Sequence, residues 1–235
     1  MTPILILTRP TAQSESFAAE VVAQWDGELR IIQSPLIEIV PLPARCDAPD
    51  AVIFTSANGV AAAGRFNLPN GLKAWCVGEK TAQLATANGF LPITGPGDAD
   101  RLVAAIISAK PIGTLAHIRG VHARGEITDR LNASGLTCED VIAYDQKELP
   151  LTEEAKNVLA ALNPVLFPLF SPRTATILNK RGPFAAPVHV IAMSDAVKNA
   201  VTEGLAIRTI TAKKPDHAAM VDATLEMLST QFGRS

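Results

Sequence analysis

Aromatic residues are scarce in this chain of 235 residues, which has eight phenylalanines, two tryptophans and one tyrosine. Proteins that bind single-stranded nucleic acid stack bases on aromatic side chains, so the composition does not indicate such a platform. Lysine and arginine form no run, and the formal net charge is −2. Because the surface as a whole lacks a basic footprint, no nucleic-acid partner is expected and an anionic ligand must be held by local groups.

Long apolar runs and paired cysteines are also missing. No run approaches the length that crosses a bilayer, and Met1–Arg9 is too short for the core of a signal peptide, so no membrane partner is expected. The three cysteines, Cys46, Cys76 and Cys138, are odd in number and widely spaced. They fit free thiols in a reducing compartment, not a disulfide or zinc framework. The expected location is the cytoplasm.

What the chain does contain is a regular alternation of short apolar runs with helical patterns. A strand at Ile4–Leu7 precedes a helix from about Ala12 to Trp25, and a strand at Ala51–Thr55 precedes a helix from about Asn58 to Ala63. Strands that alternate with helices pair in parallel, because each crossover carries a helix. The sequence therefore predicts an α/β fold with parallel sheets.

The order of elements repeats in the second half. ILILTRP matches LAHIRGV, AVIFTSANGVAAA matches LFPLFSPRTATIL, and WCVGEKTAQLATANGF matches VHVIAMSDAVKNAVTEGL. Two similar connectors, Ser34–Pro43 and Val141–Leu151, follow the first strands of each copy, and the prolines of the former favour an edge strand. We interpret this as a duplicated βα unit. On the repeat alone, the chain would divide near Lys110.

Further elements are expected in the second copy. The pattern predicts a loop at Arg119–Gly125, a strand at Leu136–Val141, a helix from Thr152 or Glu153 to Leu162, and a helix at Asp195–Glu203 that ends at Gly204.

Polar residues stand where two matching strands lead into helices. They are Thr55, Ser56, Ala57 and Asn58 in the first copy, and Ser171, Pro172 and Arg173 in the second. Free amides at a helix N-terminus bind carboxylates or phosphates, and ligands of open parallel sheets lie at such turns. A serine there is often only an N-cap. Two equivalent turns in a duplicated chain favour a shared anionic ligand.

Other anion binders are predicted at strand ends. Arg9 and Arg119 occupy matching positions in the two copies, and Gly120 and Arg124 follow in the second. A lone arginine is often merely solvated, whereas a matched pair is better support for a site. The turn with Gly78, Lys80 and Thr81 is a further amide nest. Its spacing fits neither a P-loop nor a dinucleotide fingerprint.

Strong nucleophiles and metal ligands are not indicated. His117 and His122 have no cysteine or carboxylate partner in a ligand pattern, so a metal site is rejected. No Gly-x-Ser-x-Gly, Cys/His or paired-carboxylate signature is present, which leaves nucleophilic and glycosidase chemistry without support. Tyr144, the sole tyrosine, lies in the second connector. A structural role and a role as proton donor both stay open for it.

Six motifs occur in order over nearly the whole chain: TRP, VIFTSANGV, CVGEKTAQLATANGF, HIRGVHARG, VIAY and LFSPRTA. Each is weakly diagnostic alone, but as an ordered set they resemble the uroporphyrinogen-III synthase family. The resemblance implies two flavodoxin-like α/β domains joined by a two-stranded β-ladder, with a ligand cleft between them. Domain 1 would be discontinuous, with residues 1–34 plus 147–235, domain 2 would comprise residues 41–143, and the connectors would lie at about 35–40 and 144–146.

The resemblance also implies a reaction. Hydroxymethylbilane would be cyclised to uroporphyrinogen III with loss of water and inversion of ring D through a spiro intermediate, on the way to heme, siroheme, cobalamin or chlorophyll. The family is a cyclising hydro-lyase that works without metal or organic cofactor. The implied partner is the linear tetrapyrrole, received by a monomer in a transient hand-over from hydroxymethylbilane synthase.

By the same resemblance, the three amide nests and the arginines would hold the acetate and propionate groups of the substrate. Tyr144 matches the family tyrosine of the second connector and would assist departure of the hydroxyl as a general acid. The sequence departs from the family at Ala192–Asp195, where the family often has Gly-x-x-Thr. Ser194 would replace the hydroxyl there, and Asp195 would repel a carboxylate.

A second reading of the same turns belongs to another functional class. A non-catalytic two-domain binding module for a carboxylate-bearing ligand would need the same amides and arginines. The product of a reaction with hydroxymethylbilane separates the two readings.

Overall fold

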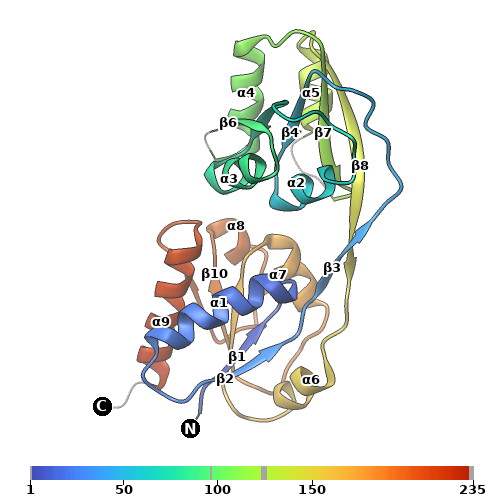
Figure 1. The fold of residues 1–235 in the computed structure, drawn as a ribbon. Helices are drawn as coiled ribbons and strands as arrows, with labels where there is room; N and C mark the ends of the chain where they lie inside the picture. The colour runs from blue at the N-terminus through green and yellow to red at the C-terminus, as the bar shows by residue number, and fades with distance from the viewer. Residues whose placement is uncertain (1, 96, 123–125, 233–235) are drawn as a thin grey trace. The chain divides into compact units, whose positions relative to one another are not determined.

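The computed structural model describes residues 2–95, 97–122 and 126–232 (Figure 1). The chain forms two compact units. Unit 1 comprises Met1–Glu38 and Glu148–Ser235, and unit 2 comprises Ile39–Lys147. The chain passes between them within strand β3 (Ile37–Pro41) and at the end of strand β8 (Thr137–Glu148). No helix within the described ranges is both long and apolar enough to cross a membrane.

Unit 1 is built on a five-stranded sheet with the order β11-β10-β9-β1-β2. The strands are β1 (Ile4–Leu7), β2 (Arg30–Gln33), β9 (Val165–Leu169), β10 (Val188–Ala192) and β11 (Arg208–Thr211), and their pairs are parallel. Central strands β1, β9 and β10 are buried along their whole length, as expected for parallel strands covered on both faces.

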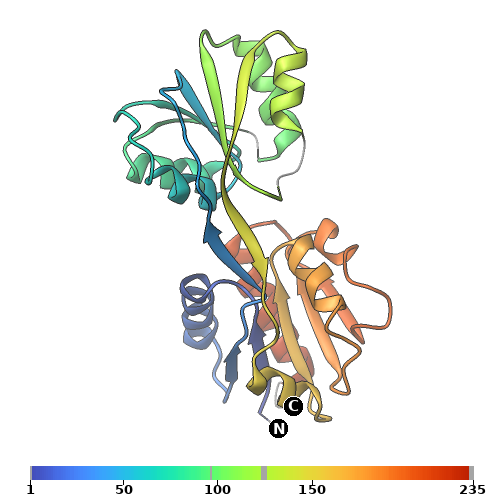
Figure 2. The ribbon, with the colours of Figure 1, turned by 90° about the vertical axis from the view of Figure 1, so that its right-hand side faces the viewer.

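Helices cover this sheet. On one face, α1 (Thr11–Gln24) and α9 (His217–Phe232) pack through Phe17, Val21 and Met220 against Leu5 and Leu7. The remaining helices are α6 (Glu153–Leu159), α7 (Pro172–Asn179) and α8 (Asp195–Lys198). Figure 2 shows α7 on the side of the sheet away from α1.

Unit 2 contains most of a six-stranded sheet with the order β3-β8-β7-β4-β5-β6. Its further strands are β4 (Ala51–Phe54), β5 (Lys73–Cys76), β6 (Leu91–Thr94) and β7 (Thr114–Gly120), and the pairs from β8 to β6 are parallel. β3 is an edge strand, which confirms the prediction from its flanking prolines. Its helices are α2 (Ala57–Ala63), α3 (Glu79–Ala87), α4 (Ala99–Ala109) and α5 (Ile127–Ala133).

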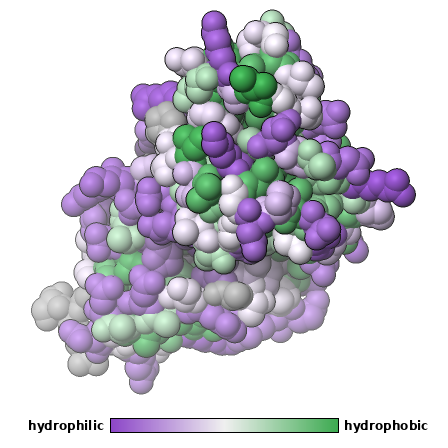
Figure 3. Space-filling model, turned by 45° about the horizontal axis from the view of Figure 1, so that its top comes forward, coloured by the Kyte–Doolittle hydropathy of each residue, from purple (hydrophilic) through white to green (hydrophobic). Residues whose placement is uncertain are grey.

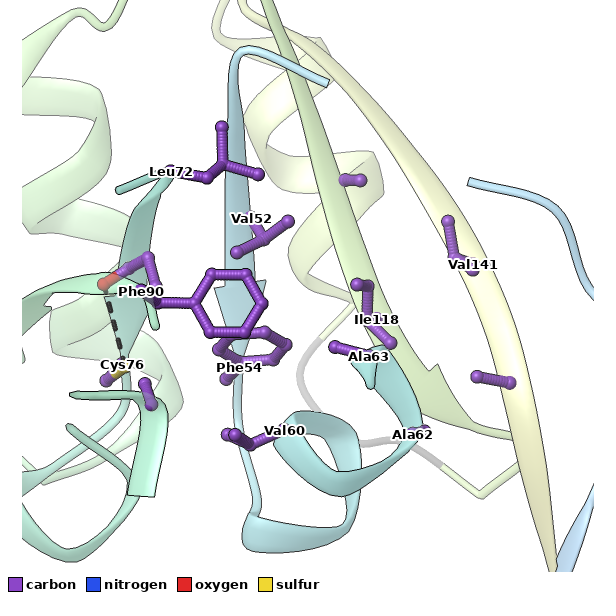
Figure 4. Packing of buried hydrophobic residues seen from close by; sticks show 14 of the residues in the cluster. Val52, Phe54, Val60, Ala62, Ala63, Leu72, Cys76, Phe90, Ile118 and Val141 are labelled. Atoms are coloured by element: carbon purple, nitrogen blue, oxygen red, sulfur yellow. Dashed lines mark hydrogen bonds between the residues drawn. The ribbon is translucent and has the colours of Figure 1, made fainter. Parts of the chain in front are cut away.

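Strand alternation divides the core of unit 2 between the two faces of the sheet. Val52 and Phe54 of β4 point to α2 and α3, and the ring of Phe54 meets Phe90 edge to face at 5.1 Å (Figure 4). Ile53 points instead to the face covered by α4 and α5, where it packs with Leu102. On the surface drawn in Figure 3, apolar residues are interspersed with hydrophilic ones.

The strand orders confirm the duplication. Read from β2, unit 1 has the order β2-β1-β9-β10-β11, and unit 2 has the matching order β8-β7-β4-β5-β6. Matching strand ends are also joined in the same way, since Met193 N–H donates to Leu169 O (3.0 Å) and Val77 N–H to Phe54 O (2.9 Å). The shared topology places the matched turns at the carboxyl edge of each sheet.

Several predicted boundaries are wrong. Arg119 and Gly120 belong to β7 and not to a loop, and β8 continues from Thr137 through the expected connector to Glu148. Helix α8 ends at Lys198, well before Gly204, and α6 ends at Leu159. The long β8 was missed because its exposed residues interrupt the apolar alternation used to recognise a strand.

Candidate functional site

A pocket of about 380 Å³ lies at the carboxyl edge of the unit 2 sheet. Five predicted site residues line it, each at or beyond the end of β4 or β7 or within β8: Thr55, Ser56, Arg119, Gly120 and Tyr144. It is also lined by six residues not predicted as binders: Val77, Gly97, Asp98, Ala99, His122 and Gln146. The carboxyl edge is where parallel sheets bind ligands, because the strands end there and leave their turns open.

Ser56 links the start of α2 to Tyr144. As the N-cap of α2, its Oγ accepts a hydrogen bond from Gly59 N–H at 3.2 Å. The same Oγ lies 3.0 Å from the hydroxyl of Tyr144. With one lone pair used by Gly59, Ser56 can still donate its proton to Tyr144. In that arrangement the phenol proton of Tyr144 is free for a ligand.

A β-bulge and a glycine position Tyr144. Arg119 pairs with Ile142, but the next pair is Gly120 with Tyr144, so β8 has one extra residue at this point. Such a bulge changes the direction of the side chains that follow it. The ring of Tyr144 lies on Gly120, where an added Cβ would come within 2.6 Å of a ring carbon. Gly120 therefore serves the site by making room for Tyr144.

Arg119 is held at the pocket by a carboxylate from the neighbouring strand. Its Nη2 donates to Oδ2 of Asp140 at 2.6 Å, and its Nη1 to the carbonyl of Gly120 at 3.0 Å. The side chain is 19% exposed. The hydrogen bond to Asp140 raises the pKa of Arg119, so its charge is permanent.

Asp140 accepts hydrogen bonds from Arg119 and Thr128 and has His117 as a third polar neighbour. Burial alone would raise its pKa, but His117, Arg119 and Thr128 together lower the pKa of Asp140 well below the ordinary value of 3.8. Thr128 Oγ1 donates to Oδ1 at 2.6 Å. Asp140 is therefore ionised at neutral pH, and it fixes Arg119 as a charged group with a defined direction.

His117 is buried between Asp140 and Thr55. Its Nδ1 lies 3.2 Å from Asp140 Oδ1, a distance typical of an ion pair, although the ring N–H is not aligned as a hydrogen bond. Its Nε2 lies 3.4 Å from Thr55 Oγ1. Sequence reasoning considered His117 only as a metal ligand and missed Asp140 and Thr128. The parallel register that sets His117 beside Asp140 is the signal that could have found them.

Unit 1 has a related arrangement at its carboxyl edge. The guanidinium of Arg9 lies 4.1 Å from the centre of the Phe170 ring, a cation–π contact directly beside Ser171. Burial lowers the pKa of Arg9, but an arginine stays charged at neutral pH. Arg9 of unit 1 thus lies close to the turn after β9, as Arg119 of unit 2 lines one pocket with the turn after β4.

Ser171 caps α7 as predicted. Its Oγ accepts from Thr174 N–H at 3.1 Å, and Pro172 occupies the first helical position. Arg173 follows in the first turn, partly exposed. Ser194 is the N-cap of the short α8, but its side chain makes no capping hydrogen bond.

Other predicted residues do not line the unit 2 pocket. Ala57 and Asn58 lie in the first turn of α2, and Gly78, Lys80 and Thr81 at the start of α3. Lys80 is exposed and Thr81 is buried at 7%. Arg124 lies outside the described residues. Among the residues that are described, no group of three or more His, Cys, Asp or Glu side chains could hold a metal ion.

Comparison with protein families gives one match that spans most of the chain. The family model described as uroporphyrinogen-III synthase HemD matches residues 26–222. The comparison with curated proteins gives no match.

Two solved structures share the fold. Uroporphyrinogen-III synthetase from Helicobacter pylori 26695 is 17% identical, with a TM-score of 0.66 over 97% of this chain and 100% of that one. A mutant uroporphyrinogen III synthase from the extremely thermophilic bacterium Thermus thermophilus is 14% identical, with a TM-score of 0.57 over 97% and 100%. At these identities the structures establish the architecture, and the family match carries the relationship.

Proposed function

The chain belongs to the uroporphyrinogen-III synthase family, and from this premise we propose that it cyclises hydroxymethylbilane to uroporphyrinogen III. The reaction loses water and inverts ring D, which makes the enzyme a cyclising hydro-lyase of heme biosynthesis. The observation that carries the proposal is the unit 2 pocket, where Tyr144, Ser56 and Arg119 converge at the carboxyl edge of a parallel sheet.

Tyr144 is the proton donor of the proposed reaction. The hydroxyl of the hydroxymethyl group leaves as water while its methylene carbon stays in the product, and the departing oxygen needs a proton as the carbon–oxygen bond breaks. Tyr144 can supply it because Ser56 stabilises the phenol oxygen from 3.0 Å when it donates to it. The electrons of the attacking pyrrole close the spiro ring, and rearrangement and proton loss then give the inverted isomer.

The arginines and amides hold the carboxylates of the substrate. Arg119 is charged and already oriented by Asp140, so it can bind an acetate or propionate with little loss of side-chain entropy. Arg9, Ser171, Pro172, Arg173 and Ser194 supply the corresponding groups of unit 1, and Ala57, Asn58, Gly78, Lys80, Thr81 and Arg124 add to those of unit 2. Their roles are proposals.

Orientation is the main source of catalysis in this account. The linear substrate cyclises unaided to isomer I, so the enzyme must favour attack at the more substituted carbon of ring D. Holding the reacting atoms in the productive geometry contributes on the order of several kcal/mol. A strong base or nucleophile is not required for that selection.

The finer architecture stays a prediction. The domain ranges 1–34 plus 147–235 and 41–143, the two-stranded ladder and the cleft between domains come from the family resemblance. So do the monomeric state, the hand-over from hydroxymethylbilane synthase and the absence of a cofactor. The cytoplasmic location is expected from the number and spacing of the three cysteines.

An isomer assay tests the proposed function. Freshly prepared hydroxymethylbilane is incubated with the protein, and the oxidised products are resolved into isomers I and III. The expected product is isomer III, formed faster than isomer I forms without protein. Isomer I alone, at the uncatalysed rate, would support a binding module in place of an enzyme.

A further inference from the structure

Thr55, His117 and Asp140 form a polar row across one face of the unit 2 sheet. His117 pairs with Ile53 of β4 on one side and with Asp140 of β8 on the other. Thr55 directly follows β4, and its Oγ1 lies 3.4 Å from Nε2 of His117, which places Thr55 at the end of this row. The side chain of His117 is only 2% exposed and does not line the pocket, whereas Thr55 does. His117 can therefore affect a bound ligand only through its contact with Thr55.

The charge of Asp140 determines which nitrogen of His117 carries the proton. Asp140 Oδ1 lies 3.2 Å from Nδ1. A lone pair on Nδ1 would face the carboxylate and be repelled, whereas an N–H there is attracted even when the alignment is imperfect. Neutral His117 therefore has its proton on Nδ1 and a lone pair on Nε2. Nδ1 makes no hydrogen bond to any of the described residues, so the carboxylate of Asp140 at 3.2 Å is the charge that acts on it.

The hydroxyl of Thr55 must then donate inward. Its Oγ1 lies 3.4 Å from Nε2 of His117, and an unprotonated Nε2 can only accept. Once its one proton is used in this way, Thr55 has only lone pairs for the pocket. Arg119, on the same face two residues after His117, shows the opposite character, since it can only donate.

We propose that His117 and Asp140 hold Thr55 as a hydrogen-bond acceptor, so that Thr55 binds a pyrrole N–H of the tetrapyrrole and not one of its carboxylates. His117 and Asp140 are positioning residues in this account, because they act through Thr55. The identity of the ligand rests on the proposed function, whereas the direction of the hydrogen bonds does not. The pocket then binds two kinds of group on the substrate: Arg119 donates to a carboxylate, and Thr55 accepts from a pyrrole N–H.

Nitrogen NMR of the wild-type protein tests the direction of the hydrogen bonds without a variant. The chemical shifts of the two ring nitrogens of neutral His117 distinguish the tautomers. The proposal predicts a protonated Nδ1 and an unprotonated Nε2 in the free protein above neutral pH. A protonated Nε2 would overturn it, because Thr55 would then accept from His117 and keep its proton for the pocket.

Asp140→Asn should reverse the tautomer. Arg119 needs an acceptor and would take the amide oxygen, which leaves the amide N–H₂ group facing Nδ1 of His117. Nε2 then carries the proton and donates to Thr55, so the O–H of Thr55 points into the pocket. There it faces a pyrrole N–H, and two donors cannot form a hydrogen bond with each other. The expected NMR result is a protonated Nε2 and an unprotonated Nδ1 in His117. The KM for hydroxymethylbilane should rise on the order of tenfold, which corresponds to the loss of one hydrogen bond.

A double-mutant cycle separates this effect from changes at Arg119. Asp140→Asn is measured in the wild-type and in the Thr55→Val background, where any effect through Arg119 is the same. The proposal predicts that Asp140→Asn raises the KM less in the Thr55→Val background than in the wild type, because the share of the increase that acts through Thr55 is lost. Thr55→Ser, which keeps the hydroxyl, should retain a near wild-type KM. Additive effects, or a lower KM in Thr55→Val, would overturn it.

The proposed function and the role of Thr55 are contradicted by different results. If the wild-type protein forms no isomer III, the proposed function fails, while the NMR result still decides the tautomer of His117. If isomer III forms but the cycle is additive, the function stands and the role of Thr55 is wrong.

Discussion

Within the described part of the chain, the hydroxyl of Tyr144 has one hydrogen-bond partner, Ser56 Oγ at 3.0 Å. Since that serine already accepts from the backbone of α2, the pair is coupled to the helix start and not free to rotate independently. If one hydroxyl rotates from donor to acceptor, the other must change from acceptor to donor. The direction of the hydrogen bond between Ser56 and Tyr144 therefore decides which of the two hydroxyl protons is free for a ligand.

Replacing Tyr144 with phenylalanine tests its role as proton donor. We expect Tyr144→Phe to lower kcat by about tenfold to a hundredfold, near the lower end of what a general acid contributes, because water can deliver a proton in its place. The product should remain isomer III, since the substrate is still oriented. Steady-state rates with isomer analysis measure both, and an unchanged kcat would remove Tyr144 from the mechanism.

Arg119→Ala tests carboxylate binding. Loss of a charge-assisted hydrogen bond should raise the KM for hydroxymethylbilane about tenfold, with a smaller effect on kcat. Arg30→Ala is the matched control, because Arg30 pairs with Glu154 at the amino end of β2 in unit 1. Equal KM values for the two variants would mean that Arg119 only forms an ion pair with Asp140.

Asp140 should also give the protein a pH-dependent stability. Its pKa is lowered in the folded state, so its contribution is present above the unfolded value of about 3.8 and is lost as the pH falls through the lower folded value. Asp140→Asn should lower the free energy of unfolding by roughly 1–3 kcal/mol at neutral pH. Denaturant unfolding should show this difference shrinking below pH 4. A constant difference down to strong acid would contradict the role given to the carboxylate.

At the scale of elements, α2 lies against β7 without room for a side chain between them. A Cβ on Gly59 would come within 2.6 Å of the carbonyl oxygen of Ile118, a backbone atom that cannot move aside. This contact sets the distance from the α2 N-terminus, with Ser56, to the end of β7, with Arg119. The geometry of the pocket therefore depends on a residue that lines no part of it.

Gly59→Ala should separate α2 from β7. We expect a loss of about 1–3 kcal/mol in the free energy of unfolding, as for other overpacked sites. Gly64→Ala is the control on the same helix, because Gly64 is exposed, has φ −61° and has its nearest atom at 3.5 Å. That change should be neutral or slightly stabilising. Similar losses in both variants would show that close packing on β7 is not the cause.

Much of the element order could be predicted from the sequence. The buried strands β1 and β9 are continuous apolar runs, and β10 is apolar except for His189. The caps Ser56, Asp98 and Ser171 mark helix starts, so the positions of these elements follow from local patterns. The extent of β8 could not be predicted, because it includes exposed charged residues. The pairing of His117 with Asp140 depends on a register between distant strands, which no local pattern contains.

At the scale of the whole molecule, the repeat and the compact units do not coincide. The first copy begins with β1 and β2, which lie in unit 1, while its later strands β4, β5 and β6 lie in unit 2. The second copy shows the converse, with β7 and β8 in unit 2. A division near Lys110 follows from the repeat, but the exchange of strand pairs between copies leaves no local mark in the sequence.

This exchange gives each unit the same kind of carboxyl edge from different parts of the chain. Arg9 and Ser171 come from the two separate segments of unit 1, as Ser56 and Tyr144 come from opposite parts of the inserted segment in unit 2. We propose that the unit 2 pocket is one place where the tetrapyrrole substrate binds.

Binding at this pocket can be measured by amide NMR of the labelled protein, titrated with uroporphyrin III as a stable relative of the product. The account predicts the largest shift changes at the backbone amides of Ser56, Gly97 and Gly120, with saturation as the ligand is added. Amides at the amino edge, such as that of Asn157, should be unaffected. Saturable shifts confined to the amino edges, with none at the pocket, would contradict the account.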